Sequence, residues 1–138
     1  MHIYKHQYQY GWDGDNGIGD QLILQIVSGI KTATCAPKVA YTPEELQWTY
    51  SLVGEICTVT DKKGIPRCNV RHLAVFETTF GHPDPRLVKG EGNGSDVRSF
   101  QADHISAWKG MAADGILLTD EAVLIVELFE LVESVSLC

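Results

Sequence analysis

The sequence lacks a long apolar run and an excess of basic residues, and we expect no secretory leader. No apolar stretch approaches the roughly 20 residues that span a bilayer, and the first residues, MHIYKHQYQYGWDG, contain no apolar signal core. The 18 Asp and Glu outnumber the 11 Lys and Arg, and the net charge of −7 disfavours broad binding to phosphate backbones. We therefore expect a cytoplasmic protein with no membrane contact, and a locally basic cleft on an acidic body stays compatible with this charge.

Metal-binding spacings are missing as well. The four cysteines do not form the short pairs of a zinc site and are expected to be free thiols: Cys35, Cys57, Cys68 and Cys138. Three histidines stand in terminal or loop contexts without a partner at metal-ligand spacing: His2, His6 and His82. We therefore predict no metal site and no cofactor.

What the sequence contains is an ordinary globular composition. With 138 residues, 44% of them hydrophobic, the chain is long enough to bury a core and is most simply one domain over residues 1–138. It shows no repeat and no low-complexity segment. Short helices alternate with a few strongly apolar strands, which predicts a small α+β barrel.

Several helices are predicted from their caps. Asp20 is expected to begin a helix that ends at Gly29, and KTATC then starts a strand. The sequence TPEE, a capping box with proline at the first helical position, predicts a helix from Thr42 to about Tyr50. Asp84-Pro85 opens a short helix that GEGNG interrupts, and Ser95 or Asp96 caps the next one.

Two long strands are expected in the sheet. Residues 67–80 alternate strictly and should pair with residues 56–60 in a hairpin closed by the DKKG turn. One face of this strand carries Cys68, Val70, His72, Ala74, Phe76, Thr78 and Phe80. The segment AVLIVELFELV, residues 122–132, is apolar on both faces and is typical of a strand inside a sheet or closed barrel.

The stretch SGIKTATC places Lys31, Thr32 and Thr34 directly after a helix stop. A threonine hydroxyl becomes a nucleophile only with a base, for which a desolvated lysine is one candidate, and a protonated lysine can instead stabilise an oxyanion. Alternatively, both threonines are ordinary strand residues and Lys31 neutralises a helix C-terminus. The residues alone leave both interpretations open.

A second candidate is VKGEGNGS, in which three glycines surround Glu91 and let the backbone approach a ligand closely. Its spacing fits neither a P-loop nor a dinucleotide fingerprint, and it could equally be a mobile turn. Two histidines are expected to serve packing. His72 lies on the apolar face of the long strand, and His104 follows helical spacing with Phe100 and Trp108.

Taken together and in order, these segments resemble the ASCH domain family. The segments are SGIKTATC, the hairpin GEICTVTDKKGIPRC, KGEGNGS before the helix with His104, and the final ELFELV, and they cover about residues 11–135. The resemblance is to small prokaryotic members with KTATC, and it implies a PUA-like fold, a small mixed β-barrel with flanking helices. Lys89 and Asn93 stand where many of these relatives have Glu and Asp.

The resemblance also implies activities and site residues. Some small members release the acyl group from N4-acetylcytidine with a lysine, a threonine and a glutamate that match Lys31, Thr34 and Glu91. We therefore expect an amidohydrolase for a modified cytidine, in which these three side chains converge on one pocket. The residues expected to contact the substrate are Thr32, Gly90, Gly92 and Ser95. The alternatives are an RNA-binding module or single-strand ribonuclease that uses the same cleft, and a nucleoside sensor without catalysis.

Overall fold

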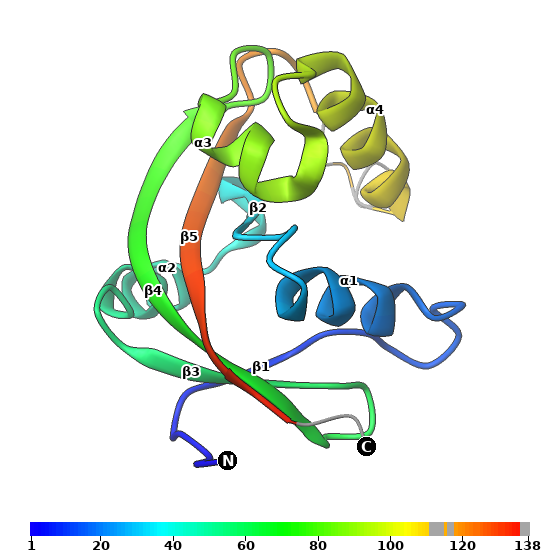
Figure 1. The fold of residues 1–138 in the computed structure, drawn as a ribbon. Helices are drawn as coiled ribbons and strands as arrows, with labels where there is room; N and C mark the ends of the chain where they lie inside the picture. The colour runs from blue at the N-terminus through cyan, green and yellow to red at the C-terminus, as the bar shows by residue number, and fades with distance from the viewer. Residues whose placement is uncertain (111–114, 116–117, 136–138) are drawn as a thin grey trace.

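The frame of the molecule is one curled sheet of five strands. The computed structural model describes residues 1–110, 115 and 118–135. The strands are β1 (Gln7–Gln9), β2 (Ala33–Pro37), β3 (Ile56–Thr60), β4 (Pro66–Thr79) and β5 (Val123–Ser134), in the spatial order β1-β3-β4-β5-β2. Only the β1–β3 pair is parallel among them. The long strands β4 and β5 arc into an open half-barrel (Figure 1), which confirms the predicted α+β architecture.

Short helices flank this sheet. They are α1 (Ile18–Val27), α2 (Pro43–Ser51), α3 (Pro85–Val88) and α4 (Val97–Ala107), with a 3₁₀ turn η1 (Lys38–Ala40) and a π-type turn η2 (Lys89–Asn93). Helix α1 lies on the concave side of the sheet, and α3 and α4 lie at one end of it (Figure 1). In the described part of the chain, no helix has the length and apolar character needed to cross a membrane.

The buried apolar side chains form two clusters along the sheet. In the first, Ile23 and Ile26 of α1 pack against strands β3, β4 and β5. In the second, Leu87 of α3 and Phe100 of α4 pack against β2 and β5. The predicted apolar face of β4 is divided between them, and His72 on that face is 2% exposed and hydrogen-bonded, as expected of a core residue.

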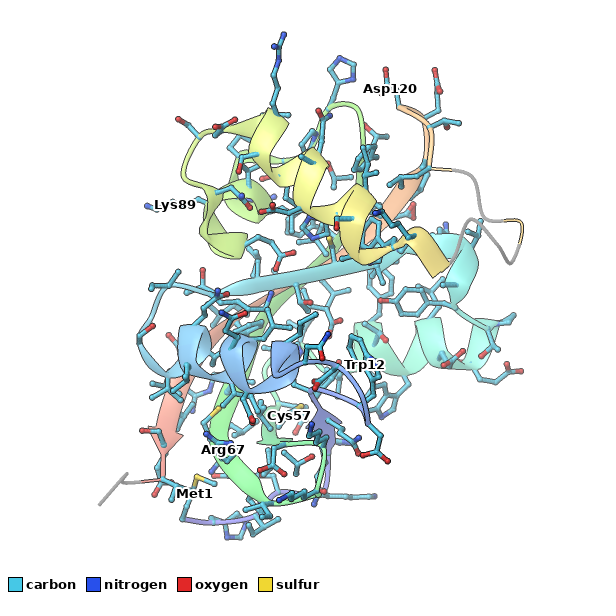
Figure 2. All side chains as sticks on the ribbon, turned by 90° about the vertical axis from the view of Figure 1, so that its right-hand side faces the viewer. Met1, Trp12, Cys57, Arg67, Lys89 and Asp120 are labelled. Carbon is cyan, nitrogen blue, oxygen red and sulfur yellow. The ribbon has the colours of Figure 1, made fainter. Side chains whose placement is uncertain are left out.

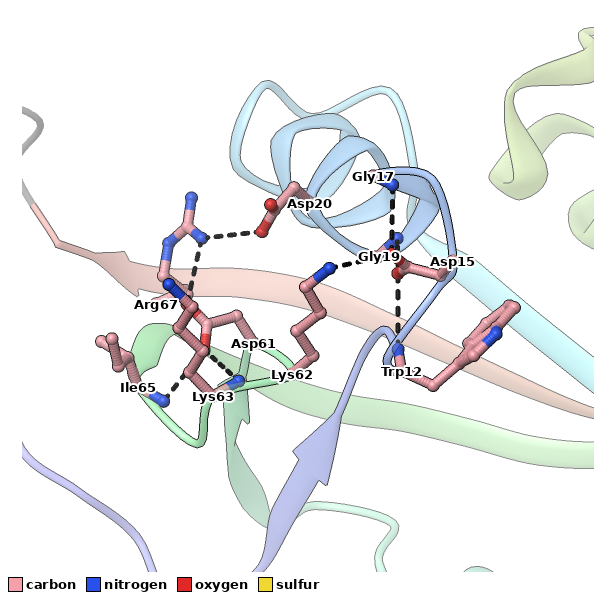
Figure 3. A network of polar contacts seen from close by, with 10 residues as sticks. All are labelled: Trp12, Asp15, Gly17, Gly19, Asp20, Asp61, Lys62, Lys63, Ile65 and Arg67. Carbon is pink, nitrogen blue, oxygen red and sulfur yellow. Dashed lines mark hydrogen bonds and ion pairs between the residues drawn. The ribbon is translucent and has the colours of Figure 1, made fainter.

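The start of α1 differs from the sequence prediction. Asp15, not Asp20, satisfies the free backbone N–H groups there: Gly17 N–H donates to Oδ1 at 3.0 Å and Gly19 N–H to Oδ2 at 2.9 Å (Figure 3). Asp20 lies inside the first turn and forms an ion pair with Arg67. The helix begins earlier than predicted because a carboxylate before a left-handed Gly17 reaches the same groups.

Most other local predictions are confirmed. Thr42 and Glu45 form the capping box of α2, Gly29 has the positive φ of 85° expected after α1, and Asp96 rather than Ser95 caps α4. The β3–β4 hairpin and the β4–β5 pair form as expected. The pairing of β4 with β5 shifts register at two places, which strict alternation does not predict. The short helix α3 runs on into η2 and is broken at the left-handed Gly92, inside the GEGNG segment where a break is expected.

Candidate active site

A pocket of about 310 Å³ lies between α1, β2, η2 and α4, a volume in the range of small-molecule sites. Its chemically active side chains are Lys31, Thr34, Cys35, Glu91, Asp103 and His104. Strand β2 runs between α1 and α4 in Figure 2, and residues of all three elements line the pocket. The three residues expected to converge, Lys31, Thr34 and Glu91, all line this pocket, and their catalytic roles stay a prediction.

Lys31 is placed by the way α1 ends. The left-handed Gly29 turns the chain, and the Lys31 backbone N–H donates to the Gln25 carbonyl of the last helical turn at 3.0 Å. The side chain is 5% exposed. Its Nζ donates to the Ala33 carbonyl oxygen at 2.7 Å and to Glu91 Oε1. Lys31 is therefore a buried cation that is already hydrogen-bonded to two acceptors.

Glu91 reaches Lys31 because η2 packs directly on the start of β2. The Thr32 N–H donates to the Gly90 carbonyl at 2.7 Å, and a Cβ on Gly90 would lie 2.5 Å from the Cβ of Ala33. Only glycine allows this approach. Burial favours a raised pKa for Glu91, but hydrogen bonds from His104 and Lys31 and their charges outweigh it, and the pKa lies below its ordinary value. Glu91 is therefore a carboxylate at neutral pH.

His104 is a member of the site that the sequence analysis assigned to packing alone. It does pack on Phe100 and Trp108, but its Nε2 also lies 2.5 Å from Glu91 Oε2 and its Nδ1 lies 2.8 Å from the Phe100 carbonyl oxygen. A carbonyl and a carboxylate oxygen can only accept. His104 therefore donates from both nitrogens in this arrangement, as an imidazolium. The helical spacing of His104 predicts that its ring packs in the core. It gives no sign that the same ring also contacts a carboxylate.

Thr34 contributes a hydroxyl from the second position of β2. It is half-buried and interacts with the phenol of Tyr10, and burial raises the pKa of Tyr10, so that the phenol keeps its proton. Among the described residues, no hydrogen bond joins Thr34 to Lys31 or Glu91. The Thr34 hydroxyl thus lines the same pocket as Lys31 and Glu91 without a hydrogen bond to either, which leaves room for a substrate between them.

The residues predicted to contact a substrate lie mostly beside the pocket. Thr32, Gly90, Gly92 and Ser95 are not among its lining residues. Gly90 is buried against β2, and Gly92 has a positive φ of 88° at the kink of η2. The two glycines shape the loop that carries Glu91, whereas Thr32 and Ser95 are exposed. Their role in substrate binding stays a prediction.

The rim of the pocket is acidic and polar. Asn93 Nδ2 donates to Asp103 Oδ2 at 3.1 Å and to Ser99 Oγ at 3.1 Å, so that η2 is tied to α4. Asn93 and Asp103 both line the pocket. Two cationic groups, Lys31 and His104, both contact Glu91, so the described lining residues offer no cation without a carboxylate partner.

Three potential metal ligands also meet here. The ligand atoms of Cys35, Glu91 and His104 lie within 4.8 Å of one another. Burial and the charge of Glu91 raise the pKa of the Cys35 thiol well above its ordinary value, so it carries its proton. Lys31 places a positive charge on the same carboxylate and repels a second cation. Cys35, Cys57 and Cys68 are free thiols, and Cys138 lies outside the described residues.

Comparison with known proteins identifies the family of this chain. A sequence model of the ASCH domain matches residues 8–133. The chain belongs to the ASCH domain family. The fold is shared with the protein EF3133 from Enterococcus faecalis V583, with a TM-score of 0.76 and 21% identity over 97% of this chain and 80% of that one. It is also shared with an ASCH domain from Lactobacillus crispatus JV V101, with a TM-score of 0.70 and 20% identity over 94% and 82%. A comparison with curated proteins gives no match.

Membership of the ASCH family limits the kinds of function to consider for this pocket. An ASCH domain has a PUA-like fold, a kind associated with RNA binding or hydrolase-type activity. At 20% and 21% identity the two solved structures show the fold alone.

Proposed function

We propose that this ASCH domain hydrolyses the amide of an N4-acylated cytidine-type nucleoside. The observation that supports it most is the meeting of Lys31, Thr34 and Glu91 around one nucleoside-sized pocket, with His104 on the far side of Glu91. Amide hydrolysis needs a nucleophile, a donor for the developing oxyanion and a proton for the leaving nitrogen. The four side chains supply all three.

Each group has a defined task. The Thr34 oxygen attacks the acyl carbon while a general base takes its proton and holds it until the ester is hydrolysed, and the carbonyl electron pair moves onto the oxygen beside the Lys31 ammonium. When the C–N4 bond breaks, His104 gives a proton through Glu91 to N4, and cytidine leaves. Water then hydrolyses the acyl–Thr34 ester, gives one proton back to His104, and Thr34 regains its own.

The walls of the pocket suit a planar base. The rings of Tyr10 and Trp108 line it together with apolar side chains of α1. Flat aromatic surfaces bind nucleobases by stacking without demanding a particular sequence around them. A free nucleoside needs nothing more than such a pocket and a few polar contacts.

Incubation with N4-acetylcytidine tests the proposal directly. We expect its ultraviolet spectrum to change into that of cytidine with the wild-type protein and with Thr34→Ser, which keeps the hydroxyl. Thr34→Val keeps the shape of the side chain without the hydroxyl and is expected to lose at least about 100-fold in rate. Equal rates for Thr34→Val and the wild type would rule out Thr34 as nucleophile, and no turnover by the wild type would reject this substrate class.

RNA binding at the same cleft is the alternative. The pocket presents its cations already paired to Glu91 and adds the carboxylate of Asp103, which suits an uncharged nucleoside better than a phosphate chain. We expect weak, strongly salt-dependent binding of single-stranded RNA. Submicromolar affinity at physiological salt would favour RNA over the free nucleoside.

A further inference from the structure

A second polar group lies on the inner side of Thr34. Thr34 on β2 and Glu127 on β5 are direct cross-strand partners, so their side chains project from the same face of the sheet. Glu127 is 4% exposed. Both side chains line a small, partly open cavity with room for about one water molecule. Thr34 and Tyr10 line this cavity and the candidate active site alike, so they form the wall between the two.

Only one oxygen of Glu127 is held by hydrogen bonds. The Tyr8 hydroxyl lies 2.5 Å and His72 Nε2 lies 3.0 Å from Oε1. No hydrogen bond among the described residues reaches Oε2. Among the described residues, every fully buried side-chain nitrogen or oxygen has a hydrogen-bond partner. Since Oε2 has none, it is not fully buried and must border space that water can reach. The small cavity beside Thr34 is such a space.

The titratable groups that interact with Glu127 stand on β1, β2, β3 and β4 and in the loops beside them. They are Tyr8, Tyr10, Cys35, Tyr41, Cys57 and His72. Burial raises the pKa of each of these tyrosines and thiols, to about 12 for Cys57, so they keep their protons at neutral pH. No lysine or arginine of the described residues pairs with Glu127.

The two carboxylates near Thr34, Glu91 and Glu127, therefore differ in the hydrogen bonds that they already accept. Both oxygens of Glu91 are occupied, one by Lys31 and the other by His104. Glu127 has one oxygen occupied and the other open toward the cavity that Thr34 lines. A general base needs a free lone pair within direct or one-water reach of the proton it removes. Glu127 Oε2 meets this condition without a competing donor among the described residues, whereas Lys31 and His104 each donate to Glu91 and lower its pKa, which makes Glu91 the weaker base.

We infer that Glu127 is the general base that activates Thr34, an assignment that rests on the proposed hydrolysis. The Thr34 proton passes to Glu127 Oε2, directly or through one water that takes this proton and gives up another. The freed electron pair of the Thr34 oxygen forms the bond to the acyl carbon. After water has hydrolysed the ester, Glu127 returns the proton to Thr34. Tyr8 and His72 act as positioning residues by fixing Oε1.

The reactivity of Thr34 toward p-nitrophenyl acetate tests the inference without any nucleoside. Release of nitrophenolate gives the rate, and mass spectrometry locates the acetyl group. Glu127→Gln keeps the size of the side chain but cannot take a proton, and we expect acetylation of Thr34 to slow by at least about 100-fold. Glu130→Gln, an exposed change on the same strand, is the matched control and should react like the wild type. Acetylation of Glu127→Gln at the wild-type rate would overturn the inference.

Tyr8→Phe gives a second test in case Glu127→Gln does not fold. It removes a hydrogen bond that stabilises the charged carboxylate, so Glu127 takes up its proton at a higher pH. The acid side of the pH–rate profile for Thr34 acetylation should move to higher pH, whereas a purely structural Tyr8 would lower the rate without moving it. An unmoved profile would contradict the assignment.

The outcomes separate this inference from the proposed function. If Thr34 is acetylated in a Glu127-dependent way while N4-acetylcytidine stays intact, the substrate class is wrong and the base assignment stands. If N4-acetylcytidine is hydrolysed and Glu127→Gln acetylates normally, the reaction class stands and the base is another group.

Discussion

His104 and Glu91 are joined by a hydrogen bond of 2.5 Å between Nε2 and Oε2, and the other oxygen of the same carboxylate contacts Lys31. Three elements meet at this point: the end of α1, η2 and the middle of α4. A carboxylate held between two cationic donors is a fixed acceptor with a lowered pKa. It can pass a proton from one side to the other without changing its own position.

Removing His104 should therefore affect the chemistry more than the fold. We expect His104→Gln to lower kcat for N4-acetylcytidine by at least about 100-fold, with a smaller change in KM, because the leaving nitrogen loses its proton source. His82→Gln changes an exposed histidine outside the pocket and should leave both constants unchanged. An unaltered kcat for His104→Gln would return His104 to the packing role that its helical spacing suggests.

Lys31 offers a test of charge against proton transfer. Its Nζ donates to two acceptors, which favours an electrostatic role beside the oxyanion. We expect Lys31→Met to lose about 100- to 1,000-fold in kcat and Lys31→Arg, which keeps the charge, to retain a clearly larger share of it. Equal loss in both would instead indicate that Lys31 removes a proton. Lys38→Met, an exposed lysine paired with Glu77, is the control and should have wild-type kcat.

Sequence patterns predicted the elements of the fold because each rests on local physical chemistry. The capping box at Thr42, the strict alternation of residues 67–80 and the doubly apolar segment 122–132 each favour one local structure. The start of α1 was predicted wrongly, because two aspartates stand close to it and only the folded chain shows which carboxylate reaches the free N–H groups. The register shifts of β4 against β5 depend on curvature, which no single strand encodes.

Sequence motifs predicted only some of the residues of the candidate site. The motif KTATC and the glycine loop pointed to Lys31, Thr34 and Glu91. His104 and Glu127 stand in segments whose apolar patterns already explain them as parts of a helix and a strand. Their polar contacts depend on residues 13 and 119 positions away, Glu91 and Tyr8. A polar residue on an otherwise apolar strand, such as Glu127 in LIVELF, was the available signal.

Gly90 should be needed for the position of Glu91. A methyl group there would lie 2.5 Å from the Cβ of Ala33 and 3.1 Å from its backbone nitrogen, so η2 would have to move away from β2. We expect Gly90→Ala to cost about 1–3 kcal/mol of unfolding free energy and to lower kcat more than tenfold by displacing Glu91. Gly110→Ala meets nothing within 4 Å and is the control for adding a methyl group. Unchanged stability and activity in Gly90→Ala would show that the loop does not need this close contact.

Asp15 should stabilise the fold in a pH-dependent way. Backbone hydrogen bonds, chiefly from Gly19, lower the pKa of Asp15 from 3.8 to about 2. The Lys62 Nζ also donates to Asp15 Oδ1 at 3.3 Å (Figure 3). A lowered pKa in the folded state contributes stability at pH values above the unfolded pKa, and this contribution is lost as pH falls toward the folded pKa. We therefore expect Asp15→Asn to be less stable than the wild type at neutral pH, in urea unfolding, and this difference to shrink between about pH 4 and pH 2. Asp13→Asn, an exposed neighbour, should match the wild type throughout. A difference that stays constant down to the lowest pH would mean that Asp15 acts through its shape and not through its charge.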